Sequence, residues 1–145
     1  MLFLGIDVGT QGARGIVCDE QGKVFAQGTC DLLWLNTSRK EEQYEQDPAM
    51  WWEAVRLAIK KCMDTLWQRG RKPLEIRAVT VDGTSGTVVP LDEKKRPLRD
   101  ALMYNDMRAA DQAVKIHEHA GELEKKMGYV FNASFALPKI LWIKE

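Results

Sequence analysis

The 145-residue sequence has few cysteines and no net charge, and each absence excludes a class of protein. Its three cysteines, Cys18, Cys30 and Cys62, form no C-x-x-C pair and no even set, so we expect neither a disulfide scaffold nor a zinc knuckle. The 21 basic residues balance 21 acidic ones, which leaves no broad basic surface for nucleic acid or an anionic membrane. Unpaired cysteines fit a reducing compartment, and we expect a cytoplasmic protein.

The first residues also lack the features of a signal peptide or a membrane span. They contain no basic segment, and a carboxylate, Asp7, follows only six residues after the start. We therefore interpret the apolar run at residues 2–8 as a buried strand rather than as a membrane segment.

The first half of the sequence predicts a small sheet covered by a helix. Three antiparallel strands in a meander are expected from apolar segments separated by polar turns, at residues 2–8, 13–19 and 24–31. Residues 36–46 are polar and predict an exposed loop. Asp47-Pro48 then predicts a helix start, and apolar residues recur every three or four positions until Arg69-Gly70. Such an amphipathic helix is expected to cover one face of the sheet.

The second half alternates shorter predicted elements. They are a strand at 75–81, a loop at 82–86, a strand at 87–91, a turn at 92–97, helices at 108–119 and 122–127, and a last helical segment at 136–145. Gly121 is expected to break the helix between residues 119 and 122. No cap, glycine or proline follows Trp142, so we expect the sequence to stop inside a helix.

The segment from Asp7 to Arg14 places a carboxylate, a glycine-bearing turn and an arginine close together. A carboxylate is a hard ligand for Mg²⁺, glycines let backbone N–H groups approach phosphate oxygens, and a guanidinium offers paired donors. The segment is not a Walker loop, because the pattern G-x-x-x-x-G-K-S/T does not occur. The same residues also fit a plain hairpin with a capping aspartate.

The wider context favours a phosphate site. A three-strand meander followed by a long helix and further strands resembles the opening of the ribonuclease H-like ATPase fold of sugar kinases, actin and heat-shock chaperones. Within that superfamily the whole sequence resembles the N-terminal domain of the FGGY carbohydrate kinases. The motifs are Gly5-Ile6-Asp7-Val8-Gly9-Thr10 with Arg14, Asp47-Pro48-x-x-Trp51-Trp52, Val81-Asp82-Gly83-Thr84-Ser85-Gly86-Thr87-Val88-Val89, and Ala101-Leu102-Met103-Tyr104-Asn105-Asp106-x-Arg108.

The resemblance implies an α/β fold of the actin-like ATPase type, with a mixed sheet opened by the meander and covered by helices. It also implies ATP and Mg²⁺ as cofactors. Asp7 would organise the Mg²⁺ of ATP, and Arg14 would offset charge on the transferring group. Gly9, Thr10 and Gln11 would bind the phosphates.

The resemblance further implies a sugar pocket. Tyr104 would pack its ring on the carbon face of the sugar, while other side chains would bind its hydroxyls: Asp82, Thr84, Ser85, Asn105 and Asp106. The motifs are most similar to those of the pentulose kinases, which phosphorylate D-xylulose or D-ribulose. Many xylulokinases carry Met-His where this sequence has Thr84-Ser85, so this loop is more similar to the D-ribulokinase type. A glycine-rich turn satisfying its own backbone, and a core role for Tyr104, remain alternatives.

Family members use an aspartate general base that lies later in a longer domain, here expected beyond Glu145. Residues 1–145 are therefore predicted to be an incomplete N-terminal domain, inactive alone, whose partners are a ketopentose and the rest of the kinase. Asp82 and Asp106 are weaker candidates for the base. Two other functions stay open: an actin-like or chaperone-like nucleotide switch, and a non-enzymatic binding module that self-associates through an exposed apolar face.

Overall fold

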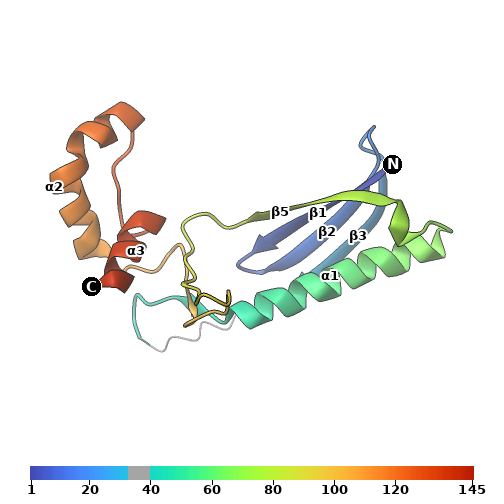
Figure 1. The fold of residues 1–145 in the computed structure, drawn as a ribbon, viewed down its shortest axis with the longest axis horizontal. Helices are drawn as coiled ribbons and strands as arrows, with labels where there is room; N and C mark the ends of the chain where they lie inside the picture. Colours follow the sequence, from blue (N-terminus) through green and yellow to red (C-terminus); the bar gives the residue numbers. More distant parts are fainter. Residues whose placement is uncertain (33–39) are drawn as a thin grey trace. The chain divides into compact units, whose positions relative to one another are not determined.

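A computed structural model describes residues 1–32 and 40–145, and the chain divides into two compact units. The first unit contains residues 1–32 and 49–84, and the second contains residues 40–48 and 85–145. The boundary falls between Thr84 and Ser85, within the loop predicted at 82–86. The colours of Figure 1 follow these segments along the chain.

A mixed sheet forms the first unit, with its strands in the order β3-β2-β1-β5. The predicted meander is confirmed, because β1 (Leu2–Gly9), β2 (Gly12–Cys18) and β3 (Val24–Asp31) pair antiparallel. A short 3₁₀ helix, η1 (Pro73–Glu75), then leads into β5 (Ile76–Gly83), which pairs parallel to β1. This parallel pairing brings the carboxyl ends of β1 and β5 to the same edge of the sheet.

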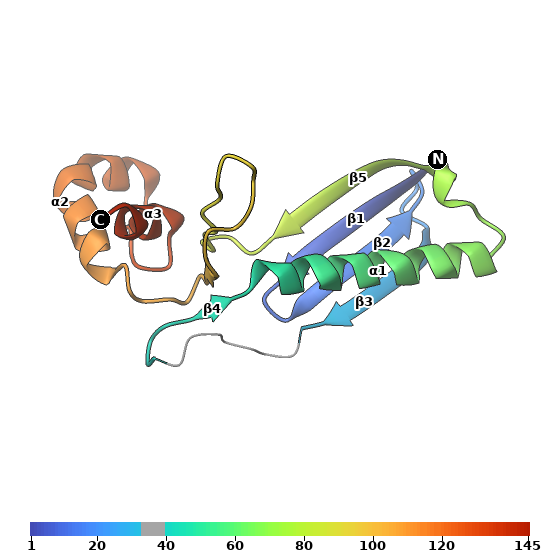
Figure 2. The same cartoon turned by 60° about the horizontal axis from the view of Figure 1, so that its bottom comes forward.

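The long helix α1 (Pro48–Gln68) covers one face of this sheet, as predicted, and Figure 2 shows it running across the strands. Alternate side chains of the strands and one stripe of the helix form the core: Leu2, Leu4, Ile6, Ala13, Val17, Ala26, Ala54, Val55, Ala58, Cys62 and Leu66. The helix lies so close to β3 that a Cβ on Gly28 would be 2.2 Å from the carbonyl oxygen of Ala58. Cys18, Cys30 and Cys62 are free, and burial raises the pKa of the Cys62 thiol.

The second unit combines a two-strand ladder with two helices. Strand β4 (Glu45–Gln46) pairs antiparallel with β6 (Ala101–Leu102), and the helices are α2 (Ala110–Met127) and α3 (Ala136–Lys144). Within the described parts of the chain, no helix is long and apolar enough to cross a membrane.

Two predictions for the second unit are wrong, and both concern strand pairing. Residues 87–91 form no strand, only isolated bridges from Val88 to Leu102 and from Leu91 to Pro97. Pro90 has no N–H to donate to a ladder, and its carbonyl accepts the Leu98 N–H instead. The predicted loop at 36–46 lies partly outside the described residues, and its end pairs with Ala101 and Leu102 as β4. The predicted turn at 92–97 is present, closed by the bond from the Asp92 N–H to the Arg96 carbonyl.

The predicted helix break at Gly121 is also wrong, because α2 runs through it without interruption. The helix ends instead at Gly128, whose left-handed φ of 77° directs its N–H to the Glu124 carbonyl. A glycine inside a helix lowers the stability of the helix, because glycine loses more conformational entropy on folding than other residues do. This cost is small enough for the helix to continue through Gly121.

Gly121→Ala is therefore expected to raise the free energy of unfolding by about 0.5–1 kcal/mol, because nothing beyond its chain neighbours and the backbone of its own helix lies within 4 Å of the added Cβ. Chemical denaturation followed by circular dichroism measures the change. Gly128→Ala is the matched control, since the same added methyl group there meets a left-handed backbone and should destabilise by about 1 kcal/mol. A loss of stability in Gly121→Ala would show that α2 does break at this glycine.

Candidate functional site

Three charged side chains occupy one row across the first unit's sheet. Register pairs Asp7 on β1 with Arg14 on β2 and with Asp82 on β5. Because neighbouring residues of a strand point to opposite faces and Ile6 is in the core under α1, the Asp7 row lies on the face away from that helix. The sheet thus presents two carboxylates and one guanidinium side by side on one exposed row.

Arg14 and Asp7 form an ion pair that water reaches freely. The Nη1 atom of Arg14 lies 3.3 Å from the Oδ2 atom of Asp7, and about half of each side chain is exposed. The guanidinium also lies beside the turn, since a Cβ on Gly9 would be 3.7 Å from its Nη1. Exposed pairs of this kind contribute little to stability, so Arg14 can exchange the carboxylate for another anion at small cost.

The turn between β1 and β2 is fixed by glycine. Gly9 pairs with Gly12, which leaves Thr10 and Gln11 as the turn residues. Gly12 has a φ of 151°, and a Cβ there would lie 2.4 Å from the carbonyl oxygen of Cys30, so no other residue fits. The Gln11 carbonyl accepts the Leu32 N–H at 2.8 Å, which ties the turn to the end of β3. The backbone of Gly9 and Thr10 is therefore held at the carboxyl end of β1, close in sequence to Asp7.

The donor set of this row suits Mg²⁺ bound together with a phosphate ligand. Mg²⁺ keeps several waters and takes one or two protein carboxylates plus phosphate oxygens, and Asp7 and Asp82 supply two carboxylates on adjacent strands. Within residues 1–32 and 40–145, no group of three or more His, Cys, Asp or Glu side chains could hold a metal. Two carboxylates leave coordination positions for phosphate oxygens and water, so the row suits a metal that arrives with a phosphate ligand.

The second unit holds Asp106 in a buried ionic network. Its carboxylate is 1% exposed, and its Oδ2 accepts bonds from Arg108 Nη2 at 2.8 Å and from the Tyr44 N–H at 2.8 Å. Its Oδ1 accepts the Arg108 backbone N–H and Nε, each at 3.0 Å. Burial opposes ionisation of Asp106, but these hydrogen bonds outweigh it and keep its pKa below the ordinary value. Arg108 also bonds Glu45 at 2.8 Å, and its guanidinium carbon lies 5.0 Å from the centre of the Trp142 ring. Both oxygens of Asp106 are thus engaged within the protein, and none is directed to a ligand.

The predicted sugar residues Ser85 and Tyr104 lie on segments that meet in the second unit. Gly86, with a left-handed φ of 75°, packs so tightly that a Cβ would lie 2.2 Å from the Ser134 carbonyl oxygen and 3.6 Å from the Tyr104 Cβ. Tyr104 itself is 44% exposed, and Asn105 is half-buried beside it. Backbone contact through Gly86 thus brings the Ser85 turn against the Tyr104 loop.

The predicted site residues are divided between the two units. The first unit brings together Asp7, Gly9, Thr10, Gln11, Arg14 and Asp82, with Thr84 at its end. The second unit brings together Ser85, Tyr104, Asn105 and Asp106.

Sequence reasoning missed the charged residues that support the second group. Glu45 bonds Arg99 and Arg108, which are 54 and 63 residues away, and no local pattern indicates such a pairing. Lys139 is fully buried, and the sequence could have indicated this, because Lys139 is the one charged residue in the apolar run of residues 136–143.

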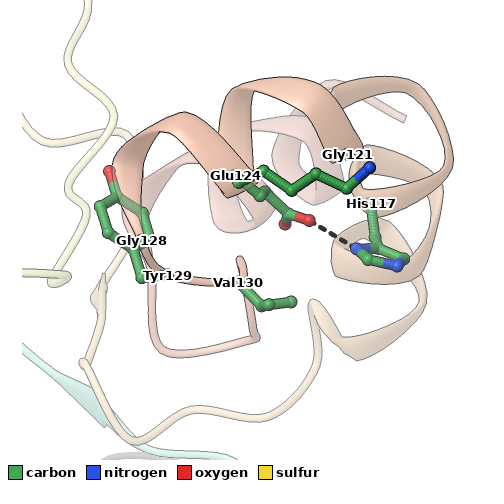
Figure 3. Close-up of a pocket in the computed structure, with 7 residues that line it drawn as sticks. His117, Gly121, Glu124, Gly128, Tyr129 and Val130 are labelled. Carbon is green, nitrogen blue, oxygen red and sulfur yellow. Dashed lines mark hydrogen bonds and ion pairs between the residues drawn. The ribbon is translucent and has the colours of Figure 1, made fainter.

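A separate open pocket of about 450 Å³ lies along α2 and contains none of the predicted site residues. Figure 3 shows His117 and Glu124 joined across it, with 2.5 Å between His117 Nδ1 and Glu124 Oε2. Glu124 also accepts the Phe131 N–H at 2.7 Å, and this bond is the main cause that lowers its pKa. Glu124 therefore holds the segment that follows Gly128 against α2, while His117 bonds its other carboxylate oxygen.

Comparison with known proteins identifies relatives along the whole chain. Residues 2–145 match the model of the FGGY family of carbohydrate kinases, N-terminal domain. The xylulose kinase of Streptomyces coelicolor is 32% identical over 148 residues, and that of Escherichia coli is 31% identical over 145. Each alignment covers 99% of this chain but 28% of the relative, so the chain spans less than a third of their length.

Solved structures share the fold. A xyloylose kinase from Brucella ovis matches with a TM-score of 0.85 at 24% identity, covering 99% of this chain and 29% of that one. A gluconate kinase from Lactobacillus acidophilus matches with a TM-score of 0.79 at 23% identity, covering 99% and 28%. These neighbours have the actin-like ATPase fold of sugar kinases, and the predicted α/β fold of the ribonuclease H-like type is confirmed.

Proposed function

Because the chain belongs to the FGGY family of carbohydrate kinases, we propose that it provides the phosphate-binding hairpin and part of the sugar pocket of an ATP-dependent ketopentose kinase. The observation that carries the proposal is the row Asp82, Asp7 and Arg14 beside the Gly9–Thr10 turn, in a chain that matches the family at residues 2–145. The relatives named xylulose kinase favour D-xylulose as the acceptor, whereas the Thr84-Ser85 loop favours D-ribulose.

The proposed role of the β1–β2 hairpin is to position positive charge and hydrogen-bond donors against the phosphates of ATP. Mg²⁺ supplies neutralisation of the phosphate oxygens when ATP is bound, and Asp7, with Asp82 next to it, would hold that ion or its waters. Backbone N–H groups of Gly9, Thr10 and Gln11 would bind phosphate oxygens, and Arg14 would leave Asp7 to pair with the transferring group. Positioning and electrostatic stabilisation supply most of the rate in phosphoryl transfer, so these contacts are the main contribution of this segment.

On the sugar side, exposure decides which residues can touch the substrate. Tyr104 offers a half-exposed ring for the carbon face of the sugar, and Asn105, Thr84 and Ser85 offer polar groups for its hydroxyls. Asp106 would have to leave Arg108 and the Tyr44 N–H to bind a hydroxyl. We therefore propose that Asp106 acts by positioning the loop, and that Tyr104 and Asn105 make the contact.

The general base and the ATP-covering domain are expected outside residues 1–145, so we propose that this chain alone gives no turnover. That these residues are the first part of a longer kinase's N-terminal domain, and that the protein is cytoplasmic, stay predictions. The prediction of self-association also stays open, and Val79 and Val81 of β5 offer an apolar surface for it, at 58% and 65% exposure.

The test is ATP-dependent phosphorylation of D-ribulose, D-xylulose, L-ribulose and glycerol by the product of the whole open reading frame and by the 145-residue chain. We expect turnover of a pentulose by the former and none by the latter, because positioned charge without a base does not deprotonate the hydroxyl. ATP hydrolysis with no sugar product would favour the nucleotide switch. Neither hydrolysis nor sugar product would favour the binding module.

A further inference from the structure

Lys139 is a lysine in an unusual environment. Its side chain has no exposed surface, and its Nζ atom donates to the carbonyl oxygens of Ala133 at 2.7 Å and of Tyr104 at 3.2 Å. Burying an ammonium group is costly even when it is hydrogen-bonded, and a methionine would fill much of the same space without that cost. Packing alone therefore does not account for a lysine at this position.

The two carbonyl groups belong to segments that carry the proposed sugar residues. Tyr104 is itself one of them. Ala133 precedes Ser134, whose carbonyl oxygen lies against the backbone of Gly86, next to Ser85. One ammonium group thus connects the Tyr104 loop to the Ala133–Ser134 turn on which the Ser85–Gly86 turn rests.

We propose that Lys139 is a positioning residue for sugar binding, which sets the spacing between the Ser85–Gly86 turn and the ring of Tyr104. The inference rests on the proposed function, and it adds a residue that does not touch the sugar. The other end of the same loop is held by the bonds from Arg108 to Asp106, so the loop is fixed at both Tyr104 and Asp106. Burial lowers the pKa of Lys139 to about 8, while the charge of Asp106 raises it, so the group is mainly an ammonium at neutral pH.

The test is nuclear magnetic resonance of the isotope-labelled 145-residue chain, comparing wild type, Lys139→Met and Lys144→Met. The control, Lys144, is an exposed lysine of the same helix. In Lys139→Met, the amide order parameters of Gly86 and Tyr104 should fall from about 0.85 to below about 0.6. In the whole-reading-frame product, the same substitution should raise the dissociation constant for D-xylulose or D-ribulose about tenfold or more, because displaced contacts lose most of their effect. Lys144→Met should change neither quantity.

Unchanged order parameters in a folded Lys139→Met protein overturn the proposal. If that variant does not fold, the wild type supplies a second test: the carbonyl carbon shifts of Tyr104 and Ala133 should titrate with the Lys139 side chain, with a midpoint near pH 8. Asp106, which faces Lys139, and Arg108 and Glu45 behind it keep their charges over this range, because the pKa is lowered for both acids and raised for the arginine. Carbonyl shifts that do not follow Lys139 overturn the proposal.

The two proposals fail separately. If the whole-reading-frame product binds neither pentulose while the loop loosens in Lys139→Met, the positioning role stands and the sugar assignment fails. If a pentulose binds wild type and Lys139→Met equally, with the loop unchanged, the proposed function stands and the role of Lys139 is overturned.

Discussion

Asp7→Asn is expected to lower ATP-dependent sugar phosphorylation by the whole-reading-frame product about a thousandfold. The amide is close in size to the carboxylate but neutral, so it removes the charge that would hold Mg²⁺ or its waters against the phosphates. Steady-state kinetics over a range of Mg²⁺ concentrations measures the loss. Because Asp7 is half-exposed and pairs only across an open hairpin, the variant should fold like wild type.

Asp64→Asn is the matched control for this prediction. Asp64 is also an exposed aspartate of the first unit, paired with Lys60 at 2.7 Å, but it lies on α1, which covers the sheet face opposite the charged row. Activity of Asp64→Asn should equal that of wild type. If Asp7→Asn keeps activity within tenfold of wild type at saturating Mg²⁺, Asp7 does not have the metal role, and Asp82 becomes the carboxylate to test.

Local sequence patterns predicted most of the first unit and less of the second. The meander and α1 follow from alternation and from the three- and four-residue spacing of apolar residues, which act within one element. β4 depends instead on pairing with Ala101 and Leu102, which are far away in sequence. A strand of two residues is too short to show an alternating pattern that would predict this pairing. At Gly121 the wrong break came from treating a tolerated glycine as a terminator, while Gly128 had the left-handed geometry that ends helices.

The candidate site shows the same division. Asp7 to Arg14 is contiguous in sequence, so its grouping could be predicted from a hairpin alone. The position of Asp82 next to Asp7 could not, because it depends on the register of a parallel pair formed across 75 residues of chain. The pairing of Asp106 with Arg108 was also missed, although both residues belong to one motif, because their burial against Glu45 arises only in the folded chain.

Arg108→Met is expected to lower the free energy of unfolding of the second unit by about 3–5 kcal/mol. Methionine replaces much of the packing against Trp142 but leaves the Asp106 carboxylate buried without its cation. Chemical denaturation at pH 7, read from the tryptophan signal and from hydrogen exchange of residues 101–108, measures the loss. Lys125→Met is the control, because Lys125 forms an exposed ion pair with Glu122 in the same unit and its loss should leave stability unchanged.

The charge of Asp106, rather than lost packing, should account for most of that effect. Asp106→Asn combined with Arg108→Met should be more stable than Arg108→Met alone, since the amide still accepts the Tyr44 N–H without a buried charge.

The pH dependence of the free energy of unfolding should also reflect the charge of Asp106. In wild type the lowered pKa of Asp106 stabilises the fold above its unfolded pKa, and this stabilisation is lost as pH falls through the lower folded pKa. In Arg108→Met the unpaired, buried carboxyl should have a raised pKa, so its cost disappears on protonation. The stability gap between the two proteins should therefore narrow from pH 7 towards about pH 4, and a gap that stays constant would assign the loss to packing against Trp142 instead.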